Sequence, residues 1–155
     1  MASVLIQLDQ SALAIWIRES GVLYGYPLIL FLHTMGLATV VGISAAIDLR
    51  LLGVASTVPL ASLDKVFGLV WAGFALTAAT GVLLFVADAT KHASNPAFFV
   101  KLAFVGGGVA TVALVRRRVF RGHQRGAFLA AASLGCWLVA LTAGRLMAYV
   151  SEFLS

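Results

Sequence analysis

The chain is short of charged residues and of cysteine, and each shortage excludes a class of protein. Only 11% of its 155 residues are Asp, Glu, Lys or Arg, whereas soluble domains carry about 25%. The single Cys136 excludes a disulfide framework and a metal–thiolate cluster, and we interpret it as a small packing residue. The sequence has no Walker loop, dinucleotide fingerprint, HExxH motif or cysteine pair, so nucleotide chemistry, zinc hydrolysis and thiol redox chemistry lack a motif.

Apolar residues are what the chain has instead. They make up 61% of it, and the mean hydropathy is +1.01. They gather in four segments of about 20 residues or more, the length that crosses a bilayer core. The sequence therefore predicts one domain over residues 1–155, an all-α integral membrane four-helix bundle. The predicted spans are 22–47, 66–87, 97–115 and 126–150.

Residues 11–20 are apolar but too short to span. Ser11 is suited to cap the start of a helix there, and Gly21 to end it. We expect a short N-terminal helix lying in the membrane interface.

The net charge of +5 is a topology signal, because five arginines fall within residues 116–125. Short basic loops stay cytoplasmic, so we expect a multi-pass protein of the bacterial inner (plasma) membrane with loop 116–125 cytoplasmic and both termini periplasmic. The excess of basic residues gives no reason to expect a nucleic-acid partner. Aromatic residues fall at the expected outer boundary, where amphipathic rings favour the headgroup region: Trp16, Tyr24, Tyr26 and Tyr149.

Three ionisable side chains lie inside predicted spans: His33, Lys101 and Arg145. At 1.5 Å per residue, His33 is roughly 15 Å and Lys101 about 6 to 8 Å from the outer ends of their helices, and Arg145 is near an outer end. Burying such groups in hydrocarbon is costly, which marks them as functional candidates. An imidazole below two cations is the arrangement expected of a b-type haem, with the imidazole on iron and the cations on the propionates.

Two glycine features bear on such a site. Gly36, one turn after His33, would leave room for the macrocycle. The run of glycines at 106–108 exposes backbone and admits a bulky neighbour, either a helix or a flat cofactor.

Other interpretations of these residues remain open. His33 is equally well explained as a neutral histidine hydrogen-bonded across a helix interface, to Thr77 or Thr80. Lys101 and Arg145 taken singly are expected to snorkel to the outer headgroups. His92 would be a second axial ligand if the second span extends, and is otherwise a solvated loop residue. His123 lies on the opposite membrane face and cannot share a metal with His33.

Several motifs resemble those of a family of small four-helix bacterial membrane proteins known chiefly as a domain of unknown function. They are WIRES at 16–20, LHTMGLATVVG at 32–42, DLRLLG at 48–53, ATGVLLF at 79–85 and NPAFFVKL at 95–102. The chain is more distantly similar to the copper-resistance D proteins and to HemJ-type protoporphyrinogen oxidases. The latter resemblance implies His33 as an axial haem ligand and Lys101 as a haem or substrate partner. The oxidase family's extended motif after the histidine is absent here, so haem binding transfers better than the oxidase activity.

These observations support three hypotheses. The leading one is a haem b-binding component of membrane electron transport, or a subunit of an oxidoreductase complex. Its expected partners are membrane lipid, a partner protein or a second copy of the chain, and a quinone. The second is a cofactor-free structural or assembly subunit of a membrane complex. The third is a porphyrinogen oxidase-like enzyme or a copper-handling membrane protein.

Overall fold

The computed structural model describes residues 2–54, 56–120 and 126–153. Within these ranges the chain is helical and contains no strand. Four helices are long and apolar enough to cross a membrane: α4 (Tyr26–Leu51), α6 (Phe67–Ala87), α8 (Pro96–Val115) and α9 (Ala127–Phe153). The prediction of an all-α, four-helix membrane bundle is confirmed.

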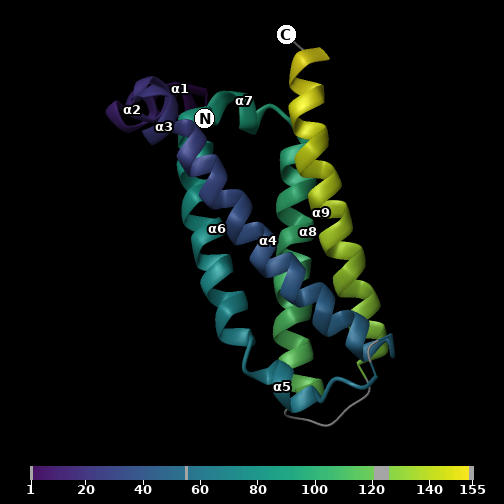
Figure 1. The fold of residues 1–155 in the computed structure, drawn as a ribbon. Coiled ribbons are helices and arrows are strands. Elements are labelled where there is room, and N and C mark those ends of the chain that lie inside the picture. The colour runs from purple at the N-terminus through teal and green to yellow at the C-terminus, as the bar shows by residue number, and fades with distance from the viewer. Residues whose placement is uncertain (1, 55, 121–125, 154–155) are drawn as a thin grey trace.

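The long helices form two pairs, which Figure 1 shows side by side. Helix α4 packs mainly on α6, and α8 packs mainly on α9. Helix α4 also contacts α9, because it crosses the bundle from one pair to the other. The two pairs diverge at the end of the bundle where α7 (Ala89–Ala93) connects α6 to α8.

Glycines let the helices of each pair approach closely. On the α8–α9 face, a Cβ added to Gly108 would lie 2.8 Å from Trp137 Cε2, and one added to Gly107 would lie 3.1 Å from Cys136 Sγ. Among the described residues, the bulky neighbour of the glycine run is therefore a tryptophan of the next helix. On the α4–α6 face, a Cβ added to Gly36 would lie 2.9 Å from the carbonyl oxygen of Gly73.

The first long helix lies about one turn further along the chain than the predicted 22–47. It begins at Tyr26 with Pro27 in its first turn, where a missing N–H costs nothing. It runs on through Asp48 and Arg50, beyond the predicted end at residue 47. Asp48 is buried, with 2% of its surface exposed, and Arg50 Nε donates to the carbonyl oxygen of Val58 at 2.6 Å. The chain turns only at Gly53, whose φ of +93° favours glycine.

The basic segment 116–125 does not begin as a loop. Its first half, Arg116–Phe120, continues α8 as one π-helical turn. The Arg116 guanidinium lies over the Phe67 ring at 5.3 Å from the centroid and pairs with Asp64, the last residue of α5 (Leu60–Asp64), at 3.9 Å. These contacts fix the Arg116 side chain at the start of the π-helical turn. Residues 121–125, His123 among them, lie outside the described residues.

Three short helices lie at the α7 end of the bundle, beside the ends of α4 and α6 (Figure 1): α1 (Ala2–Asp9), α2 (Ala12–Glu19) and α3 (Gly21–Tyr24). Helix α2 matches the short helix predicted at 11–20, and the Ser11 hydroxyl accepts the N–H of Ala14 as its cap. Buried Ile17 packs with Ala87 at the end of α6. Sequence analysis missed α1, which has no cap signal of its own.

Two side chains, here called the N-terminal clamp, fasten these helices to the α6–α7 junction. The Asp9 carboxylate accepts the backbone N–H groups of Ala89 at 2.6 Å and Thr90 at 3.2 Å, and it also accepts the Thr90 hydroxyl. Arg18, the second clamp residue, donates to the carbonyl oxygens of Ala87 and of Asp9. Together they satisfy the last turn of α6 and the first turn of α7, whose polar groups lack intrahelical partners.

Asp9→Ala is expected to lower the thermal midpoint of the protein at neutral pH. The hydrogen bond from the Thr90 hydroxyl, with those from the two backbone N–H groups, holds the pKa of Asp9 below its ordinary value of 3.8. The stabilisation by the carboxylate is therefore present above pH 3.8 and lost as the pH falls through the lower folded pKa. The difference between Asp9→Ala and the parent, followed in a pH series, should shrink in acid. Glu19→Ala, at an exposed position on α2, is the control. A difference that stays constant with pH would contradict this role.

Candidate functional site

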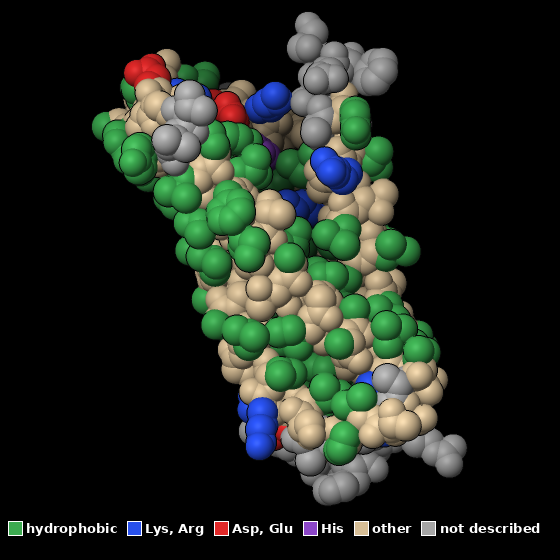
Figure 2. Space-filling view, in the orientation of Figure 1, with side chains coloured by type: hydrophobic (Ala, Val, Ile, Leu, Met, Phe, Trp, Pro, Cys, Tyr) green, Lys and Arg blue, Asp and Glu red, His purple; other side chains and the backbone are tan. Residues whose placement is uncertain are grey.

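A cavity of about 490 Å³ lies where the two helix pairs diverge. Its volume is in the range of small-molecule and cofactor sites, about 300 to 1,000 Å³. Residues from α4, α6, α7, α8 and α9 line it. Figure 2 shows the hollow at this end of the molecule, with Lys and Arg side chains around it. The cavity is therefore a partly open site that only the assembled bundle creates.

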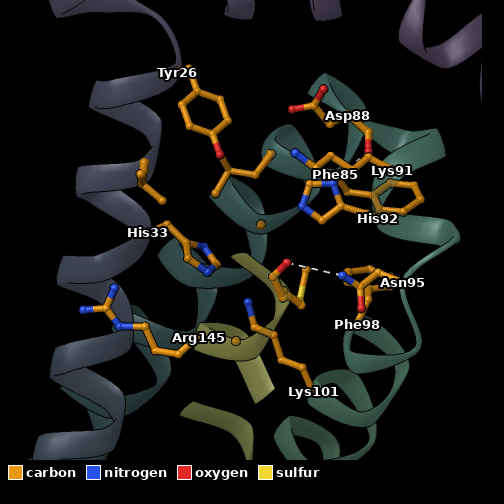
Figure 3. Close-up of a pocket in the computed structure, with 15 residues that line it drawn as sticks. Tyr26, His33, Phe85, Asp88, Lys91, His92, Asn95, Phe98, Lys101 and Arg145 are labelled. Carbon is orange, nitrogen blue, oxygen red and sulfur yellow. Dashed lines mark hydrogen bonds between the residues drawn. The ribbon is translucent and has the colours of Figure 1, made fainter. Parts of the chain in front are cut away.

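His33 projects into the cavity from α4 (Figure 3). Its Nδ1 lies 3.1 Å from the hydroxyl oxygen of Thr80 on α6. That hydroxyl also contacts the carbonyl oxygen of Leu76 at 2.7 Å, to which it can only donate. We therefore assign His33 the tautomer in which Nδ1–H donates to the Thr80 hydroxyl. The hydrogen bond to Thr80 that sequence analysis considered is thus present. It leaves the lone pair on Nε2 free, which is the state a metal-binding imidazole needs.

Lys101 reaches the same cavity from α8. Its stem passes Gly144 of α9, where an added Cβ would lie 3.7 Å from Lys101 Cδ. Figure 3 shows the ammonium group pointing toward the middle of the cavity, and none of the described carboxylates pairs with it. Lys101 is half-buried, and its side chain lines the cavity.

Arg145 lines the cavity from α9 and is exposed. Its guanidinium group points away from Lys101 (Figure 3). The structure therefore places His33, Lys101 and Arg145 on one cavity, with Arg145 at its rim. The snorkelling interpretation still fits Arg145.

His92 also lines the cavity, from the short helix α7. Its Nδ1 donates to the carbonyl oxygen of Asp88 at 2.7 Å, which again leaves Nε2 as the nitrogen with a lone pair. The ring lies beside Phe85 and Phe98, at centroid distances of 6.3 and 5.8 Å. His92 is half-buried and belongs to the site, whereas a solvated loop residue was the default expectation.

Gly36 does not belong to the cavity, which corrects its predicted role. It is buried against Thr77 and Gly73 of α6, so the space it leaves is filled by a helix and not by a macrocycle. The glycines that line the cavity are Gly81, whose added Cβ would lie 3.2 Å from His33 Cε1, and Gly144 beside Lys101. The ATGVLLF motif contains Gly81, but its spacing gives no sign that it faces His33.

Asn95, the first residue of the NPAFFVKL motif, is a further residue of the site. Its side-chain oxygen caps α8 by accepting the N–H of Ala97 at 3.0 Å. Its amide group donates to the carbonyl oxygen of Met147 on α9 at 3.3 Å. Asn95 is 5% exposed and lines the cavity, so it fixes the wall made by α8 and α9.

The charge of the lining favours an anionic ligand. Three cations, Lys91, Lys101 and Arg145, face one carboxylate, Asp88. Phe85 and Phe98 stack at 5.4 Å and give the cavity an apolar wall. The site thus combines an apolar wall, cationic groups and two imidazoles with free Nε2 atoms.

Over the described ranges, no three His, Cys, Asp or Glu side chains converge as a metal cage would require. A metal that brings its own equatorial ligands, such as haem iron, needs only one or two imidazoles. The donor set fits haem better than a free cation.

Fold and cavity together define the class: a bundle of four membrane-length helices with a histidine-lined polar cavity at one end. No protein-family model, curated protein or solved structure matches the chain. The resemblances described above therefore stay predictions.

Proposed function

We propose that the protein binds one b-type haem in this cavity, with His33 as an axial ligand, and acts as a component of membrane electron transport. The observation that carries the proposal is the state of His33. Its Nδ1–H is held by Thr80, and its Nε2 is free on a cavity lined by cations. When bound, haem supplies a one-electron redox centre whose potential depends on its axial ligands and surroundings.

The residues of the chain have separate parts in this proposal. Thr80 holds the His33 ring and its tautomer from α6. Lys101 and Arg145 would bind the two propionates, Lys101 from within the cavity and Arg145 from its rim. The stacked rings of Phe85 and Phe98 would supply an apolar wall for the haem and exclude water from it. An apolar, water-excluding shell of this kind also tunes the redox potential.

The proposed location is the bacterial inner membrane, with both termini periplasmic. The cavity lies at the end of the bundle where α4 begins and α9 ends, so it would open toward the periplasmic side. Electrons would pass between a periplasmic or quinone donor and a partner subunit. Many large apolar side chains of the long helices are exposed, as lipid or a partner helix requires.

The test is the spectrum of the protein itself. Purification in mild detergent from cells with adequate haem supply should give about one haem per chain, with a Soret band and, after dithionite reduction, an α band. Monodisperse protein that lacks these bands would overturn the proposal. It would favour the cofactor-free assembly subunit instead.

Lys101→Met is expected to weaken haem retention. The substitution keeps the length of the stem beside Gly144 but removes the charge that binds a propionate. A hydrogen bond to a charged group contributes about 1.5 to 3 kcal/mol, so the haem dissociation constant should rise by about tenfold or more. Haem transfer to apomyoglobin measures this. Lys65→Met, an exposed position just after α5, is the control and should match the parent. Equal retention by both variants would remove Lys101 from the site.

A further inference from the structure

We infer that His92 is the second axial ligand, so that the site holds a six-coordinate, bis-histidine haem. This inference rests on the proposed haem function. It assigns the second axial ligand, which the sequence left undecided. It also assigns a role to the N-terminal helices, which have none in the proposed function.

The first observation is that His33 and His92 make the same kind of hydrogen bond through Nδ1. Each Nδ1 donates to an oxygen of the protein, the Thr80 hydroxyl or the Asp88 carbonyl. Each Nε2 thus keeps its lone pair, and both rings line one cavity. A hydrogen bond from the distal nitrogen is the usual support of a metal-bound histidine. Figure 3 shows the two rings on different walls, His33 on α4 and His92 on α7.

The second observation is that the His92 ring is held by its neighbours. Phe98 meets it edge-on at 68°, and Phe98 in turn stacks on Phe85. The Nδ1 hydrogen bond is a further restraint on the ring. A solvated surface histidine would have no such set of restraints.

The third observation is that α7 itself is fastened from outside. A helix of five residues is too short to be stable alone. The clamp residue Asp9 accepts the first two N–H groups of α7, at Ala89 and Thr90. His92 follows within one turn of these anchored groups. The N-terminal helices therefore position the second ligand, although they do not reach the cavity.

Competing sixth ligands among the cavity residues include the Lys101 amine and the Met147 thioether. Lys101 would have to lose its proton, and with it the charge that attracts a propionate. The Met147 thioether has a distinct spectroscopic signature in the near infrared. These alternatives are outcomes that the experiment must separate.

The experiment compares the parent protein with His92→Ala and His92→Gln, each purified with haem. The parent should show a low-spin ferric spectrum, with the EPR and near-infrared signature of two imidazoles. Both variants should keep about one haem per chain and become high-spin, and added imidazole should restore the low-spin spectrum. If one variant fails to fold, the other variant and the EPR and near-infrared spectra of the parent still test the inference.

The contrary results are distinct. A parent that binds haem but is high-spin, or shows a methionine or amine signature, overturns the inference and leaves the proposed function standing. His92 variants that keep the low-spin spectrum of the parent also overturn the inference and leave the proposed function standing. A parent without haem overturns both.

The clamp provides a second readout. Asp9→Ala should raise the high-spin fraction while haem stays bound through His33, because α7 is loosened. Glu19→Ala, on the same N-terminal segment but outside the clamp, should leave the spin state unchanged. An unchanged spin state in Asp9→Ala would overturn the positioning role of Asp9.

Discussion

His33→Ala is expected to lower the haem content of the purified protein sharply. Removing only the hydrogen-bond partner of a metal ligand costs about 10- to 100-fold in affinity, so losing the ligand should cost more than that. The cavity would remain, because His33 is half-buried and its removal leaves the α4–α6 contacts at Gly36 intact. Haem content per chain, with chromatographic size as the check on folding, measures the effect.

Two matched variants make this result specific. Thr80→Val removes the group that holds Nδ1 but keeps the imidazole, so it should weaken haem binding only about 10- to 100-fold. His33→Gly, grown or reconstituted with imidazole, should regain the absorption that His33→Gly alone lacks. If His33→Ala retained the full haem spectrum, its assignment as a ligand would be wrong.

Gly36→Ala is expected to cause the largest loss of stability among single-methyl additions in α4. The new Cβ would lie 2.9 Å from the carbonyl oxygen of Gly73 and would overlap the Thr77 hydroxyl. Backbone cannot move aside as a flexible side chain can, so α4 and α6 must separate. Overpacking of this kind costs about 1 to 3 kcal/mol, and each kcal/mol lowers the thermal midpoint by about 2 to 4 °C at this chain length.

Gly42→Ala supplies the control, because it lies on the same helix and its added Cβ meets nothing within 4 Å. Its thermal midpoint should equal or slightly exceed that of the parent, since alanine is the better helix former. Equal midpoints for Gly36→Ala and Gly42→Ala would show that the close α4–α6 contact is absent in detergent.

The helices could be predicted well because their signals are local. Hydropathy over about 20 residues marks a span wherever the chain goes, and Ser11 caps α2 through an N–H only three residues away. The end of α4 could not be predicted in this way. The charges of Asp48 and Arg50 suggest the end of a span, but the structure buries Asp48 beside Ser133 of α9. The burial of a polar group depends on a partner that is distant in sequence.

The sequence predicted how deep the site residues lie along their helices, but not which way their side chains face. Counting residues along each helix puts His33 and Lys101 in the same half of the bundle, and the structure places both on one cavity. Which way a residue faces depends on how the helices pack. Gly36 is only one turn from His33, yet it faces α6, while Gly81 of α6 faces the His33 ring.

By itself, the sequence of this protein determined a four-helix membrane bundle with a few costly polar groups inside its apolar spans. Composition and hydropathy are properties of single segments, so no tertiary contact was needed to read them. Only the tertiary structure decided that His92 shares a cavity with His33, that the glycine run receives Trp137, and that Asp9 anchors α7. Each of these joins residues from different helices, and the side-chain packing that brings them together is not encoded at any fixed spacing along the chain.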